Sequence, residues 1–194
     1  MTMTKFPRRA GTPDAEPITL AEALTHLRES ADGGANDAYI TSLITVARMD
    51  CEDRTERTLI NTPLVLKLDA FPEAIELRSP PVVSVTALKY FDAAGVEQSV
   101  NLADTLLDPA SEPCWLVPAT GKAWPTAQTR VNAVTVEYTA GYGATPASVP
   151  APLKHWILLA IGEMYENRSA SAERPAVRNE FADYLLAPYR ILGV

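Results

Sequence analysis

The sequence has few of the residues on which disulfide, metal and cofactor chemistry depend. Its 194 residues include only two cysteines and two histidines. Cys51 and Cys114 lie far apart, and neither has a second thiol or a paired histidine close by, so neither a disulfide framework nor a zinc knuckle is expected. His26 and His155 each fall within an amphipathic helical pattern, where ordinary surface histidines are expected.

Long apolar runs are also missing. No run reaches the roughly 18 residues that a membrane-spanning helix needs, and the first residues lack the apolar centre of a secretory signal. We therefore expect a soluble protein that stays inside the cell and has no membrane partner. The composition, with 47% hydrophobic and 21% charged residues, is that of a globular chain and excludes a disordered one.

Positive charge is scarce. The formal net charge is -7, and acids outnumber bases in both 18–60 and 61–149. Tight binding of a nucleic acid needs a clustered Lys/Arg surface, which the order of residues along the chain does not indicate. We therefore do not expect DNA to be a tightly held ligand.

The motifs of common enzymes are absent. The sequence has no Gly-rich phosphate loop, dinucleotide-binding fingerprint, nucleophile elbow or zinc-binding helix motif. The Gly141-Tyr-Gly143 stretch lacks a following lysine and indicates a turn. No catalytic residue, cofactor-binding residue or metal ligand is predicted.

Hydrophobic periodicity predicts helices at both ends of the chain and strands between them. Thr19 and Glu22 have capping-box spacing, Asn36 is a good N-cap, and the period changes from helical to alternating at Pro63 and back at Pro152. The expected helices cover 19–31, 36–59, 152–168 and 175–187. The expected strands lie within 64–68, 75–77, 82–91, 96–102, 115–117 and 131–138.

This order predicts an α+β fold. Neither terminal pair of helices buries its apolar stripe alone, so we expect one four-helix bundle domain from 18–62 and 150–194. Residues 63–149 form an inserted antiparallel β-sandwich or small β-barrel domain. Residues 1–17, with three prolines and no periodicity, are expected to be a flexible N-terminal arm.

The second predicted helix carries a dense group of charges near its end. Asp50 and Arg54 are four residues apart, as are Asp53 and Arg57, which favours ion pairs along a helix. A solvated helix face and a contact surface between subunits both explain this group, and arginines interleaved with the acids make a metal site a poorer explanation. The candidate interface residues are Arg48, Asp50, Glu52, Asp53, Arg54, Glu56 and Arg57.

Five stretches resemble, in the same order, the head-tail connector (adaptor, or head-completion) proteins of long-tailed bacteriophages and gene transfer agents. They are Ile18–Arg28 (ITLAEALTHLR), Ser79–Thr86 (SPPVVSVT) with Lys89–Tyr90, Val136–Gly143 (VEYTAGYG), Val149–Lys154 (VPAPLK) leading to Met164–Arg168 (MYENR), and Leu185–Arg190 (LLAPYR). The resemblance spans residues 18–190, and the arm before Ile18 lies outside it.

The resemblance implies a structural virion protein and not an enzyme. Such a protein forms a homo-oligomeric ring below the portal at the head-tail interface, binds the portal protein and a tail-side stopper, and extends the channel through which double-stranded DNA passes. Assembly takes place in the bacterial host cytoplasm, and no cofactor is implied. Because a closed ring joins two different patches of each subunit, the charged helix end is expected to contribute to a head-to-tail contact.

Two other classes of function stay open from the residues alone. One is a small metal-dependent hydrolase that uses the carboxylates of the second helix, Glu52, Asp53 and Glu56. The other is a module that binds a carbohydrate or peptide ligand through the β insertion. Ring formation distinguishes the connector from both, and a bound metal favours the hydrolase.

Overall fold

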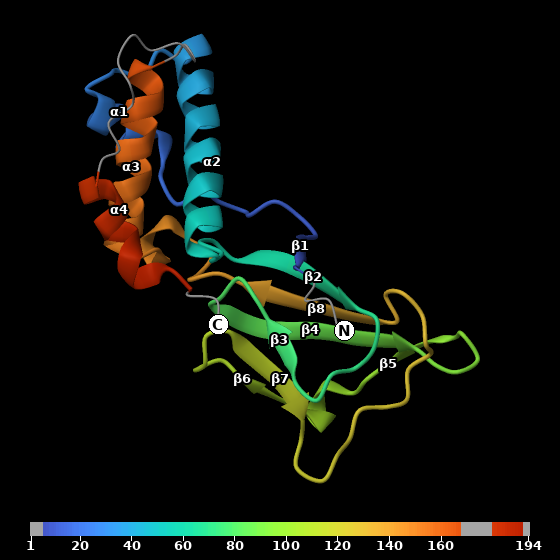
Figure 1. Ribbon diagram of the computed structural model, residues 1–194. Coiled ribbons are helices and arrows are strands. Elements are labelled where there is room, and N and C mark those ends of the chain that lie inside the picture. The colour runs from blue at the N-terminus through green and yellow to red at the C-terminus, as the bar shows by residue number, and fades with distance from the viewer. Residues whose placement is uncertain (1–5, 168–179, 192–194) are drawn as a thin grey trace. The chain divides into compact units, whose positions relative to one another are not determined.

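The computed structural model describes residues 6–167 and 180–191 (Figure 1). The chain forms two compact units. A β unit combines residues 1–14 and 61–142, and a helical unit combines residues 15–60 and 143–194. None of the helices in the described residues has both the length and the apolar content needed to cross a membrane.

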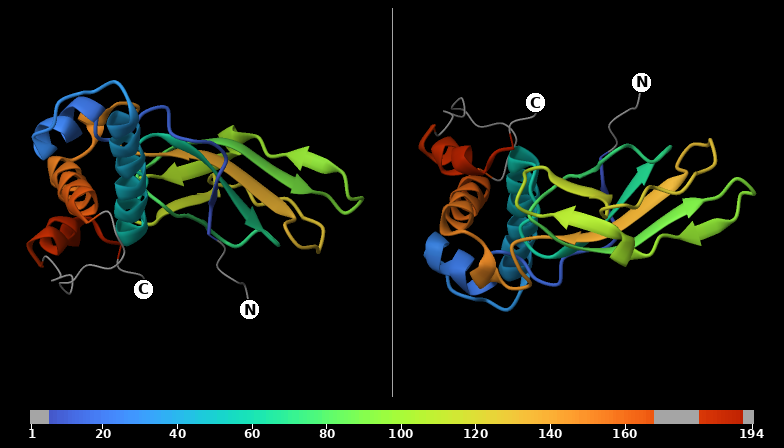
Figure 2. Two further views of the ribbon diagram at one scale, coloured as in Figure 1. Left: turned by 90° about the horizontal axis from the view of Figure 1, so that it is seen from above. Right: turned by 90° about the horizontal axis from the view of Figure 1, so that it is seen from below.

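The helical unit contains the four α-helices that the structure describes. They are α1 (Leu20–Leu27), α2 (Ala35–Thr55), α3 (Ala151–Glu166) and α4 (Glu180–Leu186). Helix α3 contacts each of the other three, and α1, α3 and α4 lie on one side of α2 (Figures 1 and 2). The core between α2 and α3 includes Ile40, Ile44, Ala47, Leu153 and Ile157, all at most 2% exposed.

Helix α1 begins with the capping box predicted from the sequence. The Thr19 Oγ1 accepts a hydrogen bond from the Glu22 N–H at 3.2 Å, and a Glu22 carboxylate oxygen accepts one from the Thr19 N–H at 2.8 Å. Lys154 of α3 binds the other Glu22 oxygen at 2.7 Å. The helix is shorter than predicted because Arg28 adopts a left-handed conformation, with φ of 57°, and ends it.

The Glu22 contacts make the stability of the helical unit depend on pH. Burial opposes ionisation, but the hydrogen bonds from Lys154 and Thr19 outweigh it and hold the pKa of Glu22 below its ordinary value. A carboxyl whose pKa is lower in the folded state stabilises the protein at neutral pH, and this contribution is lost as the pH falls from the ordinary pKa of a glutamate through the lowered pKa of Glu22.

We therefore expect Glu22→Gln to lower the free energy of unfolding by about 1 kcal/mol at pH 7 and by clearly less at a pH below the lowered pKa of Glu22, where the carboxyl of the parent is itself protonated. Urea unfolding of both proteins at the two pH values measures this difference. Glu29→Gln, which changes an exposed carboxylate just beyond α1, serves as the control. An equal destabilisation by Glu22→Gln at both pH values would contradict the assigned role.

Helix α2 differs from its prediction at both ends. It begins at Ala35 after Gly34, and Asn36 is not its N-cap; instead, the Asp37 carboxylate accepts a hydrogen bond from the Gly33 N–H at 2.8 Å. It ends at Thr55, not at residue 59, because Glu56 is left-handed with φ of 54°. Leaving the helix here allows Leu59 and Ile60 to be completely buried.

The β unit contains two antiparallel sheets. Its strands are β1 (Arg8–Arg9), β2 (Thr62–Leu68), β3 (Ile75–Leu77), β4 (Val82–Phe91), β5 (Glu97–Ser99), β6 (Thr105–Asp108), β7 (Cys114–Pro118) and β8 (Val134–Ala140). One sheet has the order β1-β2-β8-β4-β5 and the other β3-β7-β6. Both sheets contribute side chains to one core, among them Leu64, Leu88 and Val136 from the larger sheet and Ile75 and Leu116 from the smaller.

The fold is thus mixed, with four helices and two antiparallel sheets in the described residues, as the α+β prediction required. The described strands form no closed barrel. Strands β1 and β6 were not predicted, and the predicted strand over 96–102 is reduced to β5. Residue 168 of the third predicted helix and residues 175–179 of the fourth lie outside the described residues.

Both cysteines are free and buried, as expected for plain thiols. Burial raises the pKa of Cys51 to about 12 and that of Cys114 to about 11. Neither side chain is therefore a reactive thiolate at neutral pH.

Candidate subunit interface

The seven charged residues predicted as an interface fall into two groups. Arg48, Glu52 and Arg57 are buried, with 4%, 3% and 8% of their surface exposed. The other four, Asp50, Asp53, Arg54 and Glu56, are exposed or half-buried. Only this second group is accessible to a partner, while the first stabilises the helical unit itself.

Arg48 is the centre of a buried ion network. Its guanidinium donates to Glu16 at 2.6 Å and, four residues along the same helix, to Glu52 at 2.8 Å. The second Glu52 oxygen accepts the Leu59 N–H at 2.9 Å, which supports the chain just beyond the end of α2. These contacts join the segment before α1, helix α2 and the segment after it.

Arg57 contacts the segment that follows α4. Its Nε donates to the backbone oxygen of Tyr189 at 2.6 Å, and the Ile191 N–H donates to the Thr55 oxygen at 3.3 Å. A substitution at Arg57 therefore changes the packing of the helical unit and is not a clean probe of its surface.

The accessible end of α2 is mainly acidic. Asp50 and Arg54 form the predicted ion pair at 2.9 Å, and Arg54 also lies over the Trp156 ring at 5.5 Å. Asp53 and Glu56 are exposed. We call Asp50, Asp53 and Glu56 the acidic helix end.

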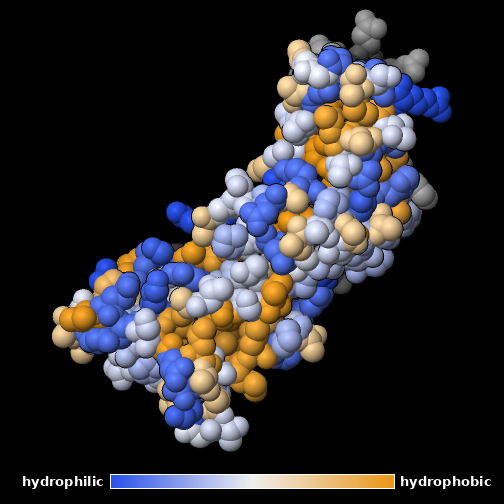
Figure 3. Space-filling model, turned by 180° about the vertical axis from the view of Figure 1, so that it is seen from behind, coloured by the Kyte–Doolittle hydropathy of each residue, from blue (hydrophilic) through white to orange (hydrophobic). Residues whose placement is uncertain are grey.

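Two exposed apolar side chains continue this surface along α2. Val46 and Met49 are each 50% exposed. Val46, Met49 and Asp53 follow at three- and four-residue spacing and so form one stripe along the helix, and Glu56 is exposed just beyond its end. Figure 3 shows exposed apolar side chains in both units on the face that it displays.

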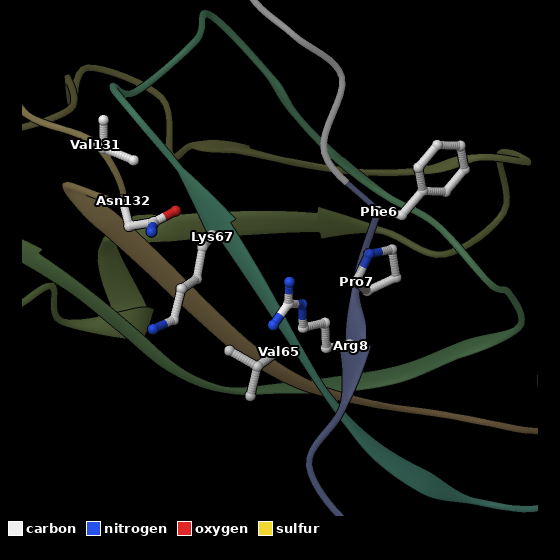
Figure 4. Close-up of a pocket in the computed structure, with 7 residues that line it drawn as sticks. All are labelled: Phe6, Pro7, Arg8, Val65, Lys67, Val131 and Asn132. Carbon is white, nitrogen blue, oxygen red and sulfur yellow. The ribbon is translucent and has the colours of Figure 1, made fainter.

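A second surface lies at the edge of the larger sheet. Strand β1 pairs with β2 only at Arg8–Val65 and Arg9–Leu64, so the N-terminal segment leaves β2 beyond Val65. A groove of about 780 Å³ opens there (Figure 4). We call it the β-edge groove; it is lined by Phe6, Pro7, Arg8, Val65, Lys67, Val131 and Asn132.

The β-edge groove combines positive charge with exposed apolar side chains. Arg8 and Lys67 both line this groove beside β2 (Figure 4), and Lys67 is exposed on the face of β2 opposite the buried Leu64 and Leu66. Phe6 is 66% and Val131 71% exposed. Such a mixture of apolar and cationic groups suits a partner surface that carries apolar groups and carboxylates.

Sequence reasoning missed this groove. Arg8 and Lys67 are far apart in the chain, and only the pairing of β1 with β2 brings them together. The adjacent Arg8 and Arg9 were the one local signal, in a segment predicted as an arm.

The carboxylates of α2 do not form a metal site in the structure. Among the described residues, no group of three or more His, Cys, Asp or Glu side chains is placed to hold a metal ion. Glu52, which is buried, already accepts hydrogen bonds from Arg48 and from Leu59. Both of its carboxylate oxygens therefore take part in contacts within the helical unit.

A scan against protein-family models and a search of curated proteins each give no match. Three solved structures of gene transfer agent (GTA) particles contain a similar chain. They are the virion of a native particle (TM-score 0.81), the neck of an empty particle computed with C6 symmetry (0.80) and the neck of a native particle computed with C12 symmetry (0.79). In each, the identity is 29%, and the match covers 98% of this chain and 97% of the other.

This similarity extends over nearly the whole of both chains, so it covers the helical and β units together. The matched proteins are structural components of particle necks, a family not known as enzymes, which agrees with the non-enzymatic role predicted here. The resemblance to the head-tail connector family is confirmed: the chain is a relative of a structural protein in the neck of gene transfer agent particles.

Proposed function

We propose that this chain is a head-tail connector, which forms a ring below the portal of a phage-like particle, extends the DNA channel and joins the capsid to the tail. The observation that carries the proposal is the match, over 98% of the chain, to neck structures computed with C6 and C12 symmetry. A cyclic neck contains repeated copies of its proteins, which supports a homo-oligomeric ring.

In this proposal the two sides of the ring contact the portal protein and a tail-side stopper, and the ring is assembled in the host cytoplasm. Double-stranded DNA passes through the ring without tight binding. The net charge of -7 supports a channel protein that repels phosphate rather than gripping it.

We propose two domains for this role: a four-helix bundle from 18–62 and 150–194, and an inserted β-sandwich from 63–149. The helices and sheets described above support this division. The exposed residues Asp50, Asp53, Arg54 and Glu56 contribute to the contact between subunits, while the buried Arg48, Glu52 and Arg57 keep the end of α2 in shape.

Particles produced without this chain test the proposal. We expect heads without attached tails, because the connection between the portal and the tail is missing. Expression of the chain in the same cells should restore tailed particles, with the protein labelled at the neck by specific antibodies in electron micrographs. Tailed particles with normal necks in the absence of the chain would contradict the proposal.

A further inference from the structure

We propose that the β-edge groove of one copy receives the acidic helix end of the neighbouring copy, so that the ring is held by two different surfaces of each subunit. This inference rests on the ring of the proposed function and names the residues that close it. A cyclic assembly needs such a pair, because a head-to-tail contact joins unlike patches, each repeated once per subunit.

The charges of the two surfaces are opposite. Arg8 and Lys67 stand together at the groove, in a chain whose net charge is -7. Elsewhere in the β unit, Lys89 pairs with Glu137 at 2.8 Å and Lys122 with Asp104 at 2.9 Å.

The acidic helix end has the complementary excess. Burial of Arg48 and Arg57 removes two of the three arginines of this helix segment from the surface, and the third, Arg54, is paired with Asp50. Asp53 and Glu56 therefore give the exposed end of α2 a net negative charge. The segment contains both acidic and basic residues, but its exposed surface is acidic because two of its arginines are buried.

The apolar groups of the two surfaces also match. Phe6 and Val131 are exposed at the groove, and Val46 and Met49 are exposed beside the acidic helix end. Buried apolar contacts supply most of the affinity of such an interface, while charged groups orient the partners and exclude wrong ones. The groove volume of about 780 Å³ lies in the range of roughly 300–1,000 Å³ typical of binding pockets, enough for several side chains from a helix end.

Zero-length cross-linking of parent particles tests the contact directly. A carbodiimide joins a lysine amine to a carboxylate only when the two are in contact. We expect a link from Lys67 to Asp53 or Glu56, found in peptides from the cross-linked dimer and not in those from the monomer. A ring-containing neck in which Lys67 is linked to a different protein, or to no carboxylate of this chain, would overturn the inference.

Charge exchange provides the second test. We expect Arg8→Glu with Lys67→Glu, and separately Asp53→Lys with Glu56→Lys, each to lower the yield of tailed particles by about tenfold or more. The four substitutions together should restore most of that yield, because the opposite charges face each other again. Failure of the fourfold variant to exceed either double variant would overturn the inference.

A matched control separates this effect from a general change of charge. Lys89→Glu with Lys122→Glu alters the net charge of the same unit by the same amount away from the groove, and should leave the yield near that of the parent. The melting temperature of each variant shows whether it is folded. The cross-link, measured on the parent, decides the question if a double variant is unfolded.

The outcomes also distinguish this inference from the function on which it rests. If the parent chain is absent from necks, the connector function fails. If the parent forms neck rings but the cross-link and the charge exchange fail, only this contact is wrong. Binding of duplex DNA fragments that is lost in Arg8→Glu with Lys67→Glu would show that the groove is a phosphate site, which would also overturn it.

Discussion

Replacing Arg48 with alanine is expected to lower the free energy of unfolding by about 3–5 kcal/mol, since it leaves the buried Glu52 carboxylate without its cation. Glu16, which binds the same guanidinium at 2.6 Å, loses its partner as well. The melting temperature should fall by roughly 10 °C. Urea unfolding followed by circular dichroism measures the loss.

Arg54→Ala is the matched control. Arg54 lies on the same helix and also pairs with a carboxylate four residues away, at 2.9 Å against 2.8 Å for Arg48, but its side chain is 42% exposed. Such a surface pair contributes about 0–1 kcal/mol. Equal losses for the two variants would show that burial does not set the strength of these pairs and would contradict the network described here.

Arg48 is buried and Arg54 is partly exposed, and this difference shows how much of the candidate interface the sequence was able to predict. Spacing predicted the Asp50–Arg54 ion pair, which is present. The same reasoning grouped Arg48 with the exposed charges, which is wrong, because Arg48 is 4% exposed. The burial of Arg48 follows from Glu16, a residue 32 positions earlier, which no periodicity within α2 reveals.

The fold itself was more predictable where local signals were strong. The capping box at Thr19 and the alternation after Pro63 both predicted elements that are present. The helix ends were less predictable, because Arg28 and Glu56 take left-handed conformations that glycine usually provides. Strand β1 was not predictable from periodicity, since two residues are too few for a pattern and the strand depends on its pairing with Leu64 and Val65.

The β-edge groove was likewise not predictable from the sequence, because its residues come from separate parts of the chain. Net charge along the sequence correctly describes an acidic chain but says nothing about which charges folding brings together. Strand pairing brings Arg8 and Lys67 to one groove, while Arg48 and Arg57 are removed from the surface by burial. A sequence that alternates in sign thus produces surfaces of opposite sign, which a head-to-tail contact requires.

Leu88→Ala is expected to lower the free energy of unfolding by about 2–5 kcal/mol, because Leu88 is 1% exposed in the core to which both sheets contribute and its truncation leaves a cavity. The adjacent Lys89→Ala removes a larger side chain from the other face of β4, where Lys89 pairs with Glu137, and should cost about 1 kcal/mol or less. Urea unfolding followed by tryptophan fluorescence compares the two variants, since Trp115 and Trp124 both lie in the β unit. A small decrease in the free energy of unfolding for Leu88→Ala would mean that the two sheets do not share a tightly packed core. In that case the alternating pattern would have predicted which face of each strand is buried, but not that packing between the sheets stabilises the β unit.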